Sequence, residues 1–404
     1  MSKRTRILAA LMATMTITTA LAGCGPKKEE GTSGETTKLT VWSHLKTNEI
    51  DNVIRPIAEE WGKENNVEVT VIEDKAEMQD AITACKSSKG PDVYFGTPHD
   101  NLGTMKESGV LAEVKSGVIN KSDYTADNVI DAVTIDGKQW AVPIAQETTC
   151  LFYNKSKVSE VPKTMEEVVE MGKTKGFQYE AHNLYLSYGF LAANGGYVFK
   201  NNGGTLDPSD IGLGNDGAKK GYTLIKSMVD ANLFKADITD DVAKANFTNG
   251  TNAFYISGPW SLADCEKSGI DFGIATLPSV GSGQTAPFMG VQTAFVNANS
   301  KNQDKSWELL KYLSEKTPAK LITEGSRLPV LKSAQSSDEF KANKYFATLA
   351  KQAEVATPMP NIKQVQAIWT PGKNNLVALL SGSQGVDDTA SKIESQVKEG
   401  IAQQ

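Results

Sequence analysis

Short apolar strand patterns alternate with amphipathic helix patterns from Lys38 onward. Residues 39–42 form a short apolar run, residues 50–61 place apolar side chains at helical spacing, and residues 67–71 alternate valine with polar residues. A further helix pattern and a further strand pattern follow before residue 97. Because strands separated by helices pair through crossover connections, this order predicts an α/β fold with a parallel sheet covered by helices.

The rest of the chain is long enough to build a second core. The sequence has 404 residues, of which 40% are apolar, and this suffices for two ordinary domains. A helical stretch with breaks is expected over residues 164–196, and the last hundred residues are expected to be mainly helical. Further strands are expected over residues 140–145, 150–153, 253–257, 272–277 and 293–297.

The first 23 residues have the pattern of a targeting segment. Three basic residues stand before position 7, and residues 7–20 are apolar or small and carry no charge. This pattern is typical of a bacterial signal peptide, and the apolar part is too short and too rich in threonine for a convincing membrane-spanning helix. The following Leu-Ala-Gly-Cys resembles the bacterial lipobox, so Cys24 is the expected lipidation site.

Residues 24–37 are expected to be the lipidated cysteine and a flexible tether, because residues 25–37 contain no large apolar side chain. The folded body would then lie at the extracellular face of the cell membrane, anchored by lipid. Residues 1–23 hold three basic and no acidic residues, so their removal leaves 39 Lys plus Arg against 48 Asp plus Glu, a net charge of −9. This acidic balance argues against a nucleic-acid partner.

Several catalytic and cofactor motifs are absent or incomplete. The chain has three histidines and neither H-E-x-x-H nor C-x-x-C, so no metal site or cofactor is expected. Gly212, Gly214 and Gly217 fit G-x-G-x-x-G, but the preceding segment is polar and contains a proline; a helix entry capped by Asn215 or Asp216 is favoured over a nucleotide site. No G-x-S-x-G is present, which weakens a hydrolase interpretation.

Three cysteines remain in the body, Cys85, Cys150 and Cys265. An odd number gives no disulfide framework, so buried free thiols are expected, with one fortuitous pair left open.

Aromatic side chains stand near Gly, Pro or the ends of elements. Trp260 follows Gly-Pro after a strand, Trp369 precedes Thr-Pro-Gly, Tyr185 lies near a helix start, and Glu147 follows Pro-Ile-Ala-Gln. Core packing is the ordinary role of a tryptophan, but loop placement favours a binding role. Aromatic faces beside carboxylates match the apolar faces and hydroxyl groups of sugars, so the sequence indicates a carbohydrate cleft.

The chain also resembles the maltose and maltodextrin-binding proteins of ABC importers. The matching segments run in the family's order from about Lys38 to the C-terminus. They are GPDVYFGTPHDNLG (90–103), SGVLAEV (108–114), DGKQWAVPIAQETTCLFYNK (136–155), AANGGYVF (192–199), ISGPWS (256–261), PFMGVQTAFVNANS (287–300) and MPNIKQVQAIW (359–369).

The resemblance implies a two-lobe periplasmic-binding-protein fold, type II-like, in which each lobe is a sheet flanked by helices and the ligand cleft lies at the hinge. It places chain crossings near residues 145–147, 290–294 and 327–330. The N-terminal lobe would comprise residues 38–145 and 294–328. The C-terminal lobe would comprise residues 146–293 and 329–404.

The family's ligand residues carry over position by position, with departures. The family's stacking tryptophan after GPDxxF is Gly96 here, its arginine beside Asp100 is Asn101, and its acidic residue two before Tyr185 is Asn183. By the resemblance, Tyr and Trp side chains stack on glucosyl rings while polar groups of the other lobe and the hinge bind hydroxyls. The expected ligand-binding residues are Trp42, His44, Lys46, Asp100, Asn101, Glu147, Tyr185, Trp260 and Trp369.

The expected function is that of a membrane-anchored, monomeric solute-binding protein and not an enzyme. It would capture maltose or maltodextrin by hinge closure and deliver it to the permease subunits of an ABC transporter. Two alternatives stay open. One is a surface glycoside hydrolase, for which Glu147 and Asp100 could serve as the carboxyl pair. The other is a binding protein for cyclodextrin or another oligosaccharide.

Overall fold

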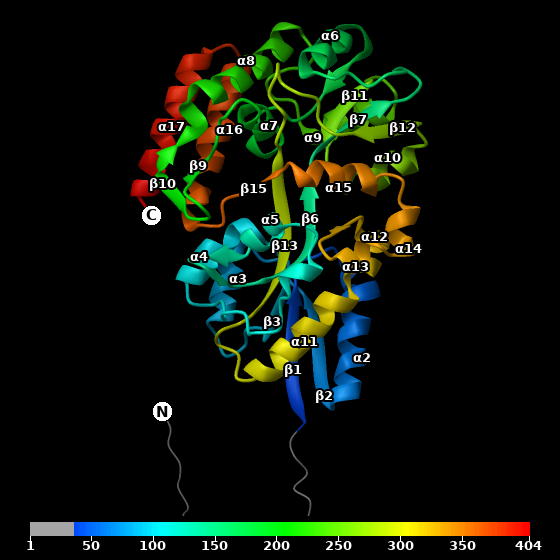
Figure 1. Cartoon of the computed structure of the whole chain (residues 1–404), viewed down its shortest axis with the longest axis vertical. Helices are drawn as coiled ribbons and strands as arrows, with labels where there is room; N and C mark the ends of the chain where they lie inside the picture. Colours follow the sequence, from blue (N-terminus) through cyan, green and yellow to red (C-terminus); the bar gives the residue numbers. More distant parts are fainter. Residues whose placement is uncertain (1–35) are drawn as a thin grey trace, which may run out of the picture. The chain divides into compact units, whose positions relative to one another are not determined.

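The larger sheet is built from segments far apart in the sequence. The computed structural model describes residues 36–404, and the predicted signal peptide and Cys24 lie outside this range. The strand order is β14-β6-β13-β3-β1-β2, with β15 paired to β13 (Figure 1). The strands are β1 (Thr37–Ser43), β2 (Val67–Glu73), β3 (Val93–Pro98), β6 (Val142–Thr148), β13 (Phe288–Val296), β14 (Leu328–Pro329) and β15 (Thr357–Pro358).

The α/β prediction is confirmed, but the expectation of a parallel sheet is correct only for part of it. β1 pairs in parallel with β2 and β3, as helical crossovers require. β13 pairs antiparallel with both β3 and β6, and β14 pairs antiparallel with β6. β13 reaches the sheet after the chain has passed through a second sheet, so no helical crossover fixes its direction.

Alternate side chains of β3 serve two different cores. In β3, Val93 and Phe95 face one core, and Tyr94 between them faces the other. The first core packs against α2 (Arg55–Asn65) and α11 (Gln303–Lys316), and the second packs against α3 (Met78–Cys85) and α4 (Leu102–Glu107). The sheet is therefore covered by helices on both faces, which explains why all nine residues of β13 are buried.

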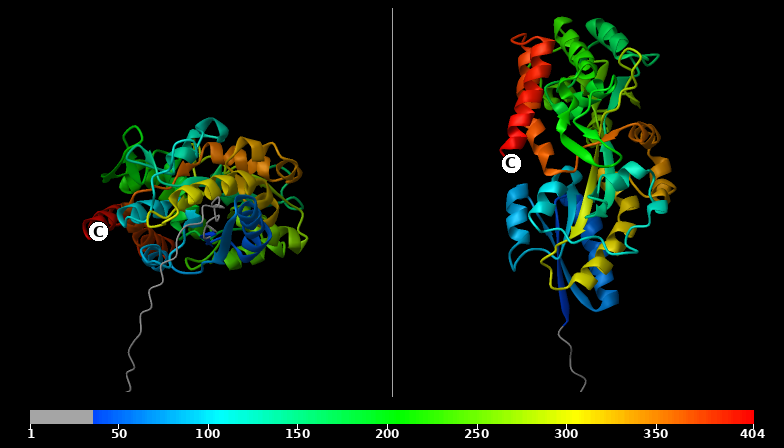
Figure 2. Two further views of the ribbon diagram at one scale, coloured as in Figure 1. Left: turned by 90° about the horizontal axis from the view of Figure 1, so that it is seen from below. Right: turned by 60° about the vertical axis from the view of Figure 1, so that its left-hand side comes forward.

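The second sheet has the order β12-β7-β11-β8 and a core of its own. Its strands are β7 (Cys150–Asn154), β8 (Phe177–Gln178), β11 (Phe254–Ser257) and β12 (Phe272–Ala275). Helices α7, α8, α16 and α17 lie together beside it (Figure 2). The helices around this core are α6 (Met165–Lys175), α7 (Leu184–Ala192), α8 (Asp216–Asp230), α9 (Asp240–Thr248), α10 (Leu262–Ser268), α16 (Gln366–Leu380) and α17 (Val386–Ala402).

The remaining elements are short connections. They are α1 (Thr47–Glu49), a π-helix (Ile50–Ile54), α5 (Asp127–Asp131), α12 (Pro318–Gly325), α13 (Lys332–Gln335), α14 (Asp338–Ala342), α15 (Phe346–Glu354), β4 (Thr134–Ile135), β5 (Lys138–Gln139), β9 (Phe199–Asn201) and β10 (Leu206–Ile211). Single-turn 3-10 helices span His99–Asn101, Lys121–Asp123, Gly212–Gly214, Pro259–Ser261 and Lys363–Val365. None of the described helices is long and apolar enough to cross a bilayer.

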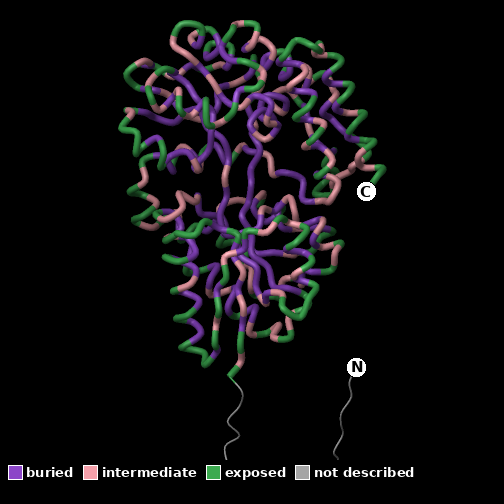
Figure 3. The backbone as a smooth tube through the Cα atoms, turned by 180° about the vertical axis from the view of Figure 1, so that it is seen from behind, coloured by how far each residue is buried: buried purple, intermediate pink, exposed green. Residues whose placement is uncertain are grey.

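The chain passes between the two sheets along buried strands. β6 ends at Thr148 in the larger sheet, and β7 begins at Cys150 in the smaller one, with a single residue between them. The central strands are buried along most of their length (Figure 3). The three predicted crossing segments fall at β6, β13 and β14, which are neighbours in the larger sheet.

Two smaller predictions are also confirmed. Cys85, Cys150 and Cys265 are buried free thiols, and burial raises the pKa of Cys85 to about 12. The helix after the glycine motif is capped by Asn215, whose side-chain oxygen accepts a hydrogen bond from the Ala218 N–H at 2.8 Å. β10, which precedes this motif, belongs to a half-exposed two-stranded hairpin rather than to a buried parallel sheet.

Candidate functional site

Glu147 lies on the strand that links the two sheets. In β6 it is paired with Gly290 of β13, and its carboxyl group occupies the space above that glycine. A Cβ atom at position 290 would lie 3.0 Å from Cγ of Glu147, so a larger residue there would displace the carboxylate. The Glu147 side chain is 24% exposed, which leaves it accessible to a ligand although it is surrounded by protein.

Three charged side chains, Glu49, Glu147 and Arg327, form a group that we call the charged floor. Arg327 Nε and Nη2 donate to the two oxygens of Glu49 at 2.7 and 3.0 Å, and Arg327 Nη1 lies 3.6 Å from Oε2 of Glu147. Burial raises the pKa of Glu147, and the positive charge of Arg327 opposes this shift. The floor carries two carboxylates and one cation.

Four aromatic rings form a second group, which we call the aromatic wall: Tyr185, Trp260, Phe288 and Trp369. The ring centroid of Tyr185 lies 6.2 Å from that of Trp260 and 6.0 Å from that of Phe288. Phe288 in turn lies 6.2 Å from Trp369. Tyr185, Trp260 and Trp369 are half-buried, so part of each ring remains open to a ligand.

Local structure places each ring of the wall. Tyr185 lies in the first turn of α7, where the Asn183 side chain accepts a hydrogen bond from its N–H at 3.0 Å. Trp260 belongs to the 3-10 helix after β11, and its ring covers Gly258 so closely that a Cβ there would lie 2.2 Å from the indole. Trp369 lies in the first turns of α16, a helix that continues through Pro371, so the loop placement expected for Trp369 is wrong.

The wall and the floor meet at Tyr185. Its hydroxyl donates to the backbone oxygen of Glu147 at 3.5 Å. Burial raises the pKa of Tyr185, and the negative charges of Glu147 and Asp100 add to this shift. The structure therefore brings together Asp100, Glu147, Tyr185, Trp260 and Trp369, five of the nine predicted residues.

Asp100 and Asn101 lie at the end of β3, opposite α16. The Asp100 backbone oxygen accepts a hydrogen bond from Gln366 at 3.3 Å, and the Asn101 amide donates to Pro98 at 3.4 Å. Burial raises the pKa of Asp100 to about 6, and the charge of Glu147 contributes to the shift. Gly96 has a φ of 101° and packs against Leu45, so the tryptophan of the family has no room at this position.

Three further predicted residues lie at the end of β1 and just after it: Trp42 in the strand, and His44 and Lys46 beyond it. Lys46 is exposed; its N–H donates to Glu49 at 2.9 Å, and its charge lowers the pKa of Glu147. His44 is exposed, and its ring Nδ1 lies 3.0 Å from the backbone oxygen of Asp74. Trp42 is half-buried and packs against the core beneath α3 and α4, so core packing is one role of this side chain.

Three members of these groups were not predicted from the sequence: Glu49, Phe288 and Arg327. Glu49 is a fully buried carboxylate in a short helix, and only its contact with Arg327 reveals its role. Phe288 is fully buried and joins Tyr185 to Trp369, but within an apolar strand it looks like any core residue. Arg327 precedes β14 in a loop with no recognisable motif. Only the antiparallel pairing of β14 with β6 brings it to Glu147, and a local pattern cannot reveal this pairing.

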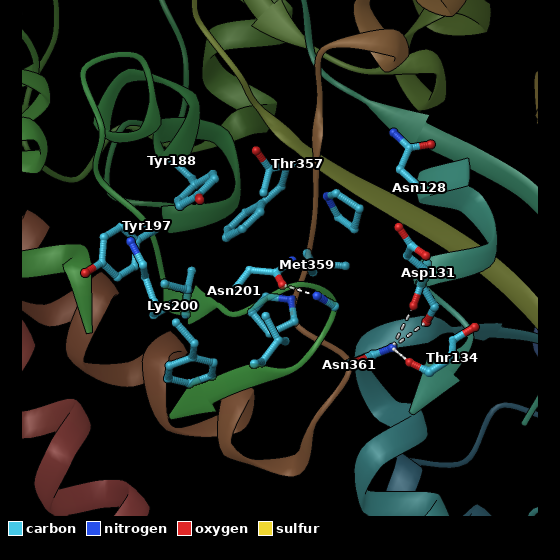
Figure 4. Close-up of a pocket in the computed structure, with 18 residues that line it drawn as sticks. Asn128, Asp131, Thr134, Tyr188, Tyr197, Lys200, Asn201, Thr357, Met359 and Asn361 are labelled. Carbon is cyan, nitrogen blue, oxygen red and sulfur yellow. Dashed lines mark hydrogen bonds between the residues drawn. The ribbon is translucent and has the colours of Figure 1, made fainter. Parts of the chain in front are cut away.

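Phe288 also lines a separate cavity of about 420 Å³, together with Tyr188 and Asn361. Figure 4 shows this cavity. Tyr188 stacks on Phe288 with ring centroids 3.7 Å apart, and Asn361 donates to backbone oxygens of residues 131, 132 and 134 at 2.9 to 3.1 Å. The cavity contains none of the nine predicted ligand residues. Because it lacks the carboxylates of the floor, we do not assign the sugar site to it.

The wall and the floor supply complementary chemistry. Aromatic faces bury the apolar faces of a ligand, and carboxylates accept hydrogen bonds from its hydroxyl groups. Among the described residues, no cluster of three or more His, Cys, Asp or Glu side chains could hold a metal ion. The arrangement suits binding of a neutral polyhydroxylated molecule.

Comparisons with known proteins support this interpretation. A galactooligosaccharide-binding protein of Bacillus subtilis (strain 168) is 32% identical over 405 residues, with 95% of each chain covered. A maltooligosaccharide ABC transporter solute-binding lipoprotein of Streptococcus pneumoniae serotype 4 (strain ATCC BAA-334 / TIGR4) is 29% identical, covering 100% of this chain and 99% of that one.

A solved structure resembles the chain over nearly its whole length. The maltose-maltodextrin binding protein of Alicyclobacillus acidocaldarius superposes with a TM-score of 0.81 and 37% sequence identity, covering 90% of this chain and 100% of that one. The predicted resemblance and the predicted fold are thus confirmed. Residues 57–348 match the family described as bacterial extracellular solute-binding protein, whose members bind solutes and are not enzymes. The chain therefore belongs to the bacterial extracellular solute-binding protein family.

Proposed function

We propose that this protein captures maltose and maltodextrins, oligosaccharides of α-linked glucose, and delivers them to an ABC importer. The observation that carries the proposal is the aromatic wall beside Glu147, with rings spaced 6.0 to 6.2 Å apart and half-exposed at three positions. Tyr185, Trp260 and Trp369 would stack on glucosyl rings. Glu147 and Asp100 would accept hydroxyl hydrogen bonds, and Asn101, His44, Lys46 and Trp42 would line the outer part of the cleft.

Binding would drive closure of two lobes. We assign residues 38–145 and 294–328 to the N-terminal lobe and residues 146–293 and 329–404 to the C-terminal lobe. The four rings of the wall would belong to the C-terminal lobe, and Asp100 would belong to the N-terminal lobe. Only a closed arrangement lets both lobes touch one sugar, so the ligand stabilises that arrangement by differential contact. The permease subunits would then recognise the closed form.

We further propose that the mature protein is a monomer anchored to the membrane through Cys24. Removal of residues 1–23 would expose Cys24 as the lipidated N-terminus, and residues 24–37 would form the tether. The lipobox-like sequence and the similar streptococcal lipoprotein support this proposal. Cys24→Ala should release the protein from the membrane fraction into the medium, as a quantitative blot of the two fractions would detect.

A second ligand class has specific support. The galactooligosaccharide-binding relative is 32% identical, slightly more than the 29% of the maltooligosaccharide-binding one. Galactooligosaccharides and cyclodextrins therefore belong in the same ligand screen. The family match gives the hydrolase alternative no support. Only release of glucose from maltotriose by the purified protein would support that alternative.

A thermal-shift screen tests the ligand assignment directly. Maltose, maltotriose, longer maltodextrins, cyclodextrins and galactooligosaccharides would each be added to the purified chain. A ligand that binds only the folded state raises the melting temperature, and at one hundred times Kd it adds about 2.7 kcal/mol of stability. We expect linear maltodextrins to give the largest shift. A larger shift with galactooligosaccharides would overturn the assignment to α-glucans and leave the binding class in place.

A further inference from the structure

Arg327 lies where the charged floor joins the larger sheet. Leu328 in β14 pairs with Gln146 in β6, so the antiparallel register places Arg327 next to Glu147. The guanidinium group contacts Glu49 through two nitrogen atoms and Glu147 through the third. One cation thus lies between two carboxylates that come from different parts of the chain.

Glu49 holds this guanidinium in a fixed position. The Glu49 side chain is fully buried, and its two oxygens accept hydrogen bonds from Arg327 and from the Lys46 N–H. A Cβ atom on Gly325 would lie only 1.9 Å from Oε1 of Glu49. The glycine at position 325 is therefore what makes room for the Glu49 carboxylate. A two-pronged Arg–carboxylate contact is directional, and Arg327 therefore has little freedom to move.

Glu147 depends on Arg327 in a different way. The 3.6 Å separation is too long for a hydrogen bond but short enough for a strong charge interaction in a partly dry site. The other charged groups that influence Glu147 are Glu49, Lys46 and Asp100, and Gln292 donates a hydrogen bond to it. Without Arg327, two carboxylates would act on Glu147 and only the exposed Lys46 would oppose them.

We propose that Arg327, anchored by Glu49, is a positioning residue that keeps the Glu147 carboxylate in place as an acceptor for ligand hydroxyl groups. The inference rests on the proposed function, because it assigns Glu147 to the ligand site. It predicts that binding weakens when Arg327 loses its charge even if the fold is retained. A purely structural ion pair would affect stability and leave the affinity and its pH dependence unchanged.

The test removes both buried charges at once. Glu49→Gln combined with Arg327→Met leaves no unpaired ion from that pair, so the double variant has the best chance of folding. Calorimetric titration with the oligosaccharide that the wild-type protein binds would run from pH 8 to pH 5.5. We expect at least tenfold weaker binding at pH 7 and a further loss at lower pH, because Glu147 protonates at higher pH without Arg327. The single variant Arg327→Lys should bind more tightly than the double variant, because lysine keeps the positive charge beside Glu147.

A matched control removes an ion pair elsewhere. Lys138 and Glu113 form an ion pair with 2.6 Å between Nζ and Oε2, and neither residue belongs to the floor. The variant Lys138→Met with Glu113→Gln should leave binding unchanged. If the Glu49/Arg327 double variant folds and keeps wild-type affinity and pH profile, Arg327 is a structural residue only and the inference is wrong. If the double variant does not fold, Arg327→Gln alone decides, because glutamine removes the charge but can still donate a hydrogen bond to Glu49. An affinity and a pH profile equal to those of the wild type would then contradict the inference.

Failure of the proposed function gives a different signature. If the wild-type protein binds no oligosaccharide, the ligand assignment fails. The effect of Arg327 on Glu147 is then measured in the ligand-free protein, by carboxyl carbon NMR of Glu147 across the same pH range. An unchanged Glu147 pKa in the Arg327→Lys and double variants would overturn the inference without reference to any ligand.

Discussion

The aromatic wall and the charged floor differ in how they constrain a ligand. The wall consists of four rings in a row, with the centroids of successive rings 6.0 to 6.2 Å apart, and such contacts tolerate small rotations of the partner. The floor consists of charged groups at fixed positions, with hydrogen bonds of 2.7 and 3.0 Å between Arg327 and Glu49. Buried apolar area supplies affinity, whereas an unpaired polar group costs about 1–3 kcal/mol. The wall should therefore set how tightly sugars bind, and the floor should set which sugars bind.

The largest expected effect comes from breaking the wall. Trp260→Ala and Trp369→Ala should each weaken maltodextrin binding tenfold or more, because a half-exposed indole offers a large stacking surface and alanine offers almost none. Both variants should lose affinity for all oligosaccharides to a similar degree. Calorimetric titration measures the affinities. Unchanged affinity in both variants would show that the ligand site lies elsewhere.

Trp140 provides the control for the wall variants. It is half-buried like Trp260, but it packs against the core beneath α3 and α4 and lies over Lys106. Trp140→Ala should lower the melting temperature and leave the affinity for oligosaccharides within about twofold of the wild-type value. A loss as large as that of Trp260→Ala would mean that the wall has no special role.

Glu147→Gln should sharpen the contrast between the two groups. The amide keeps the shape of the carboxylate but donates on one side, so a hydroxyl that donates to this position loses its acceptor. We expect about tenfold weaker binding of the preferred sugar, with a smaller loss for the other sugars. The ratio of affinities for maltotriose and a galactooligosaccharide is the measurement. An unchanged ratio would contradict a role for the floor in selection.

Much of the fold could be predicted from the sequence because it is encoded locally. The alternation of residues 39–97 predicts the βα order, and apolar spacing predicts the helix over residues 50–61, part of which is α2. The direction of β13 could not be predicted. Its residues alternate as any buried strand does, and its antiparallel pairing depends on where the chain returns from the second sheet.

The site divides in the same way. Trp260 and Trp369 were predicted because each precedes or follows Gly and Pro, an unusual place for a core tryptophan. Glu49, Phe288 and Arg327 were missed because their roles arise from contacts between distant segments. Trp42 was predicted as a ligand residue, but the structure shows it packed against a core. A tryptophan in β1 can face either the core or a ligand, and the sequence does not distinguish the two. The ligand role of Trp42 stays a prediction.

Phe288→Leu tests whether a buried residue supports the wall from behind. Leucine keeps the strand apolar but removes the stacking on Tyr188 and the edge contact with Trp369. We expect the free energy of unfolding to fall by about 1 kcal/mol and binding to weaken about threefold, because Tyr185 and Trp369 lose a shared support. Urea unfolding and calorimetric titration measure the two effects. A change in stability with no change in affinity would limit Phe288 to core packing.

The smallest expected effect is the contribution of Asp100, which lies near Glu147, to the pH dependence of the free energy of unfolding. Burial raises the pKa of this carboxyl from 3.8 to about 6, so the folded protein binds the proton more tightly than the unfolded chain does. Asp100 therefore destabilises the fold when it is ionised above about pH 6, and this cost disappears below about pH 4. Asp100→Asn should be about 1 kcal/mol more stable than the wild-type protein at pH 7.5, because the side chain keeps some contact with water.

Urea unfolding of both proteins at pH 7.5 and pH 4 measures this difference. The gain from Asp100→Asn should vanish at pH 4, where wild-type Asp100 is protonated and neutral like the amide. Asp304→Asn is the matched control: Lys115 lowers the pKa of Asp304, so this variant should lose stability at neutral pH instead of gaining it. If Asp100→Asn is less stable than the wild-type protein at pH 7.5, ionised Asp100 makes favourable contacts that outweigh its burial. It would then belong with Glu147 as an acceptor held ready for the ligand.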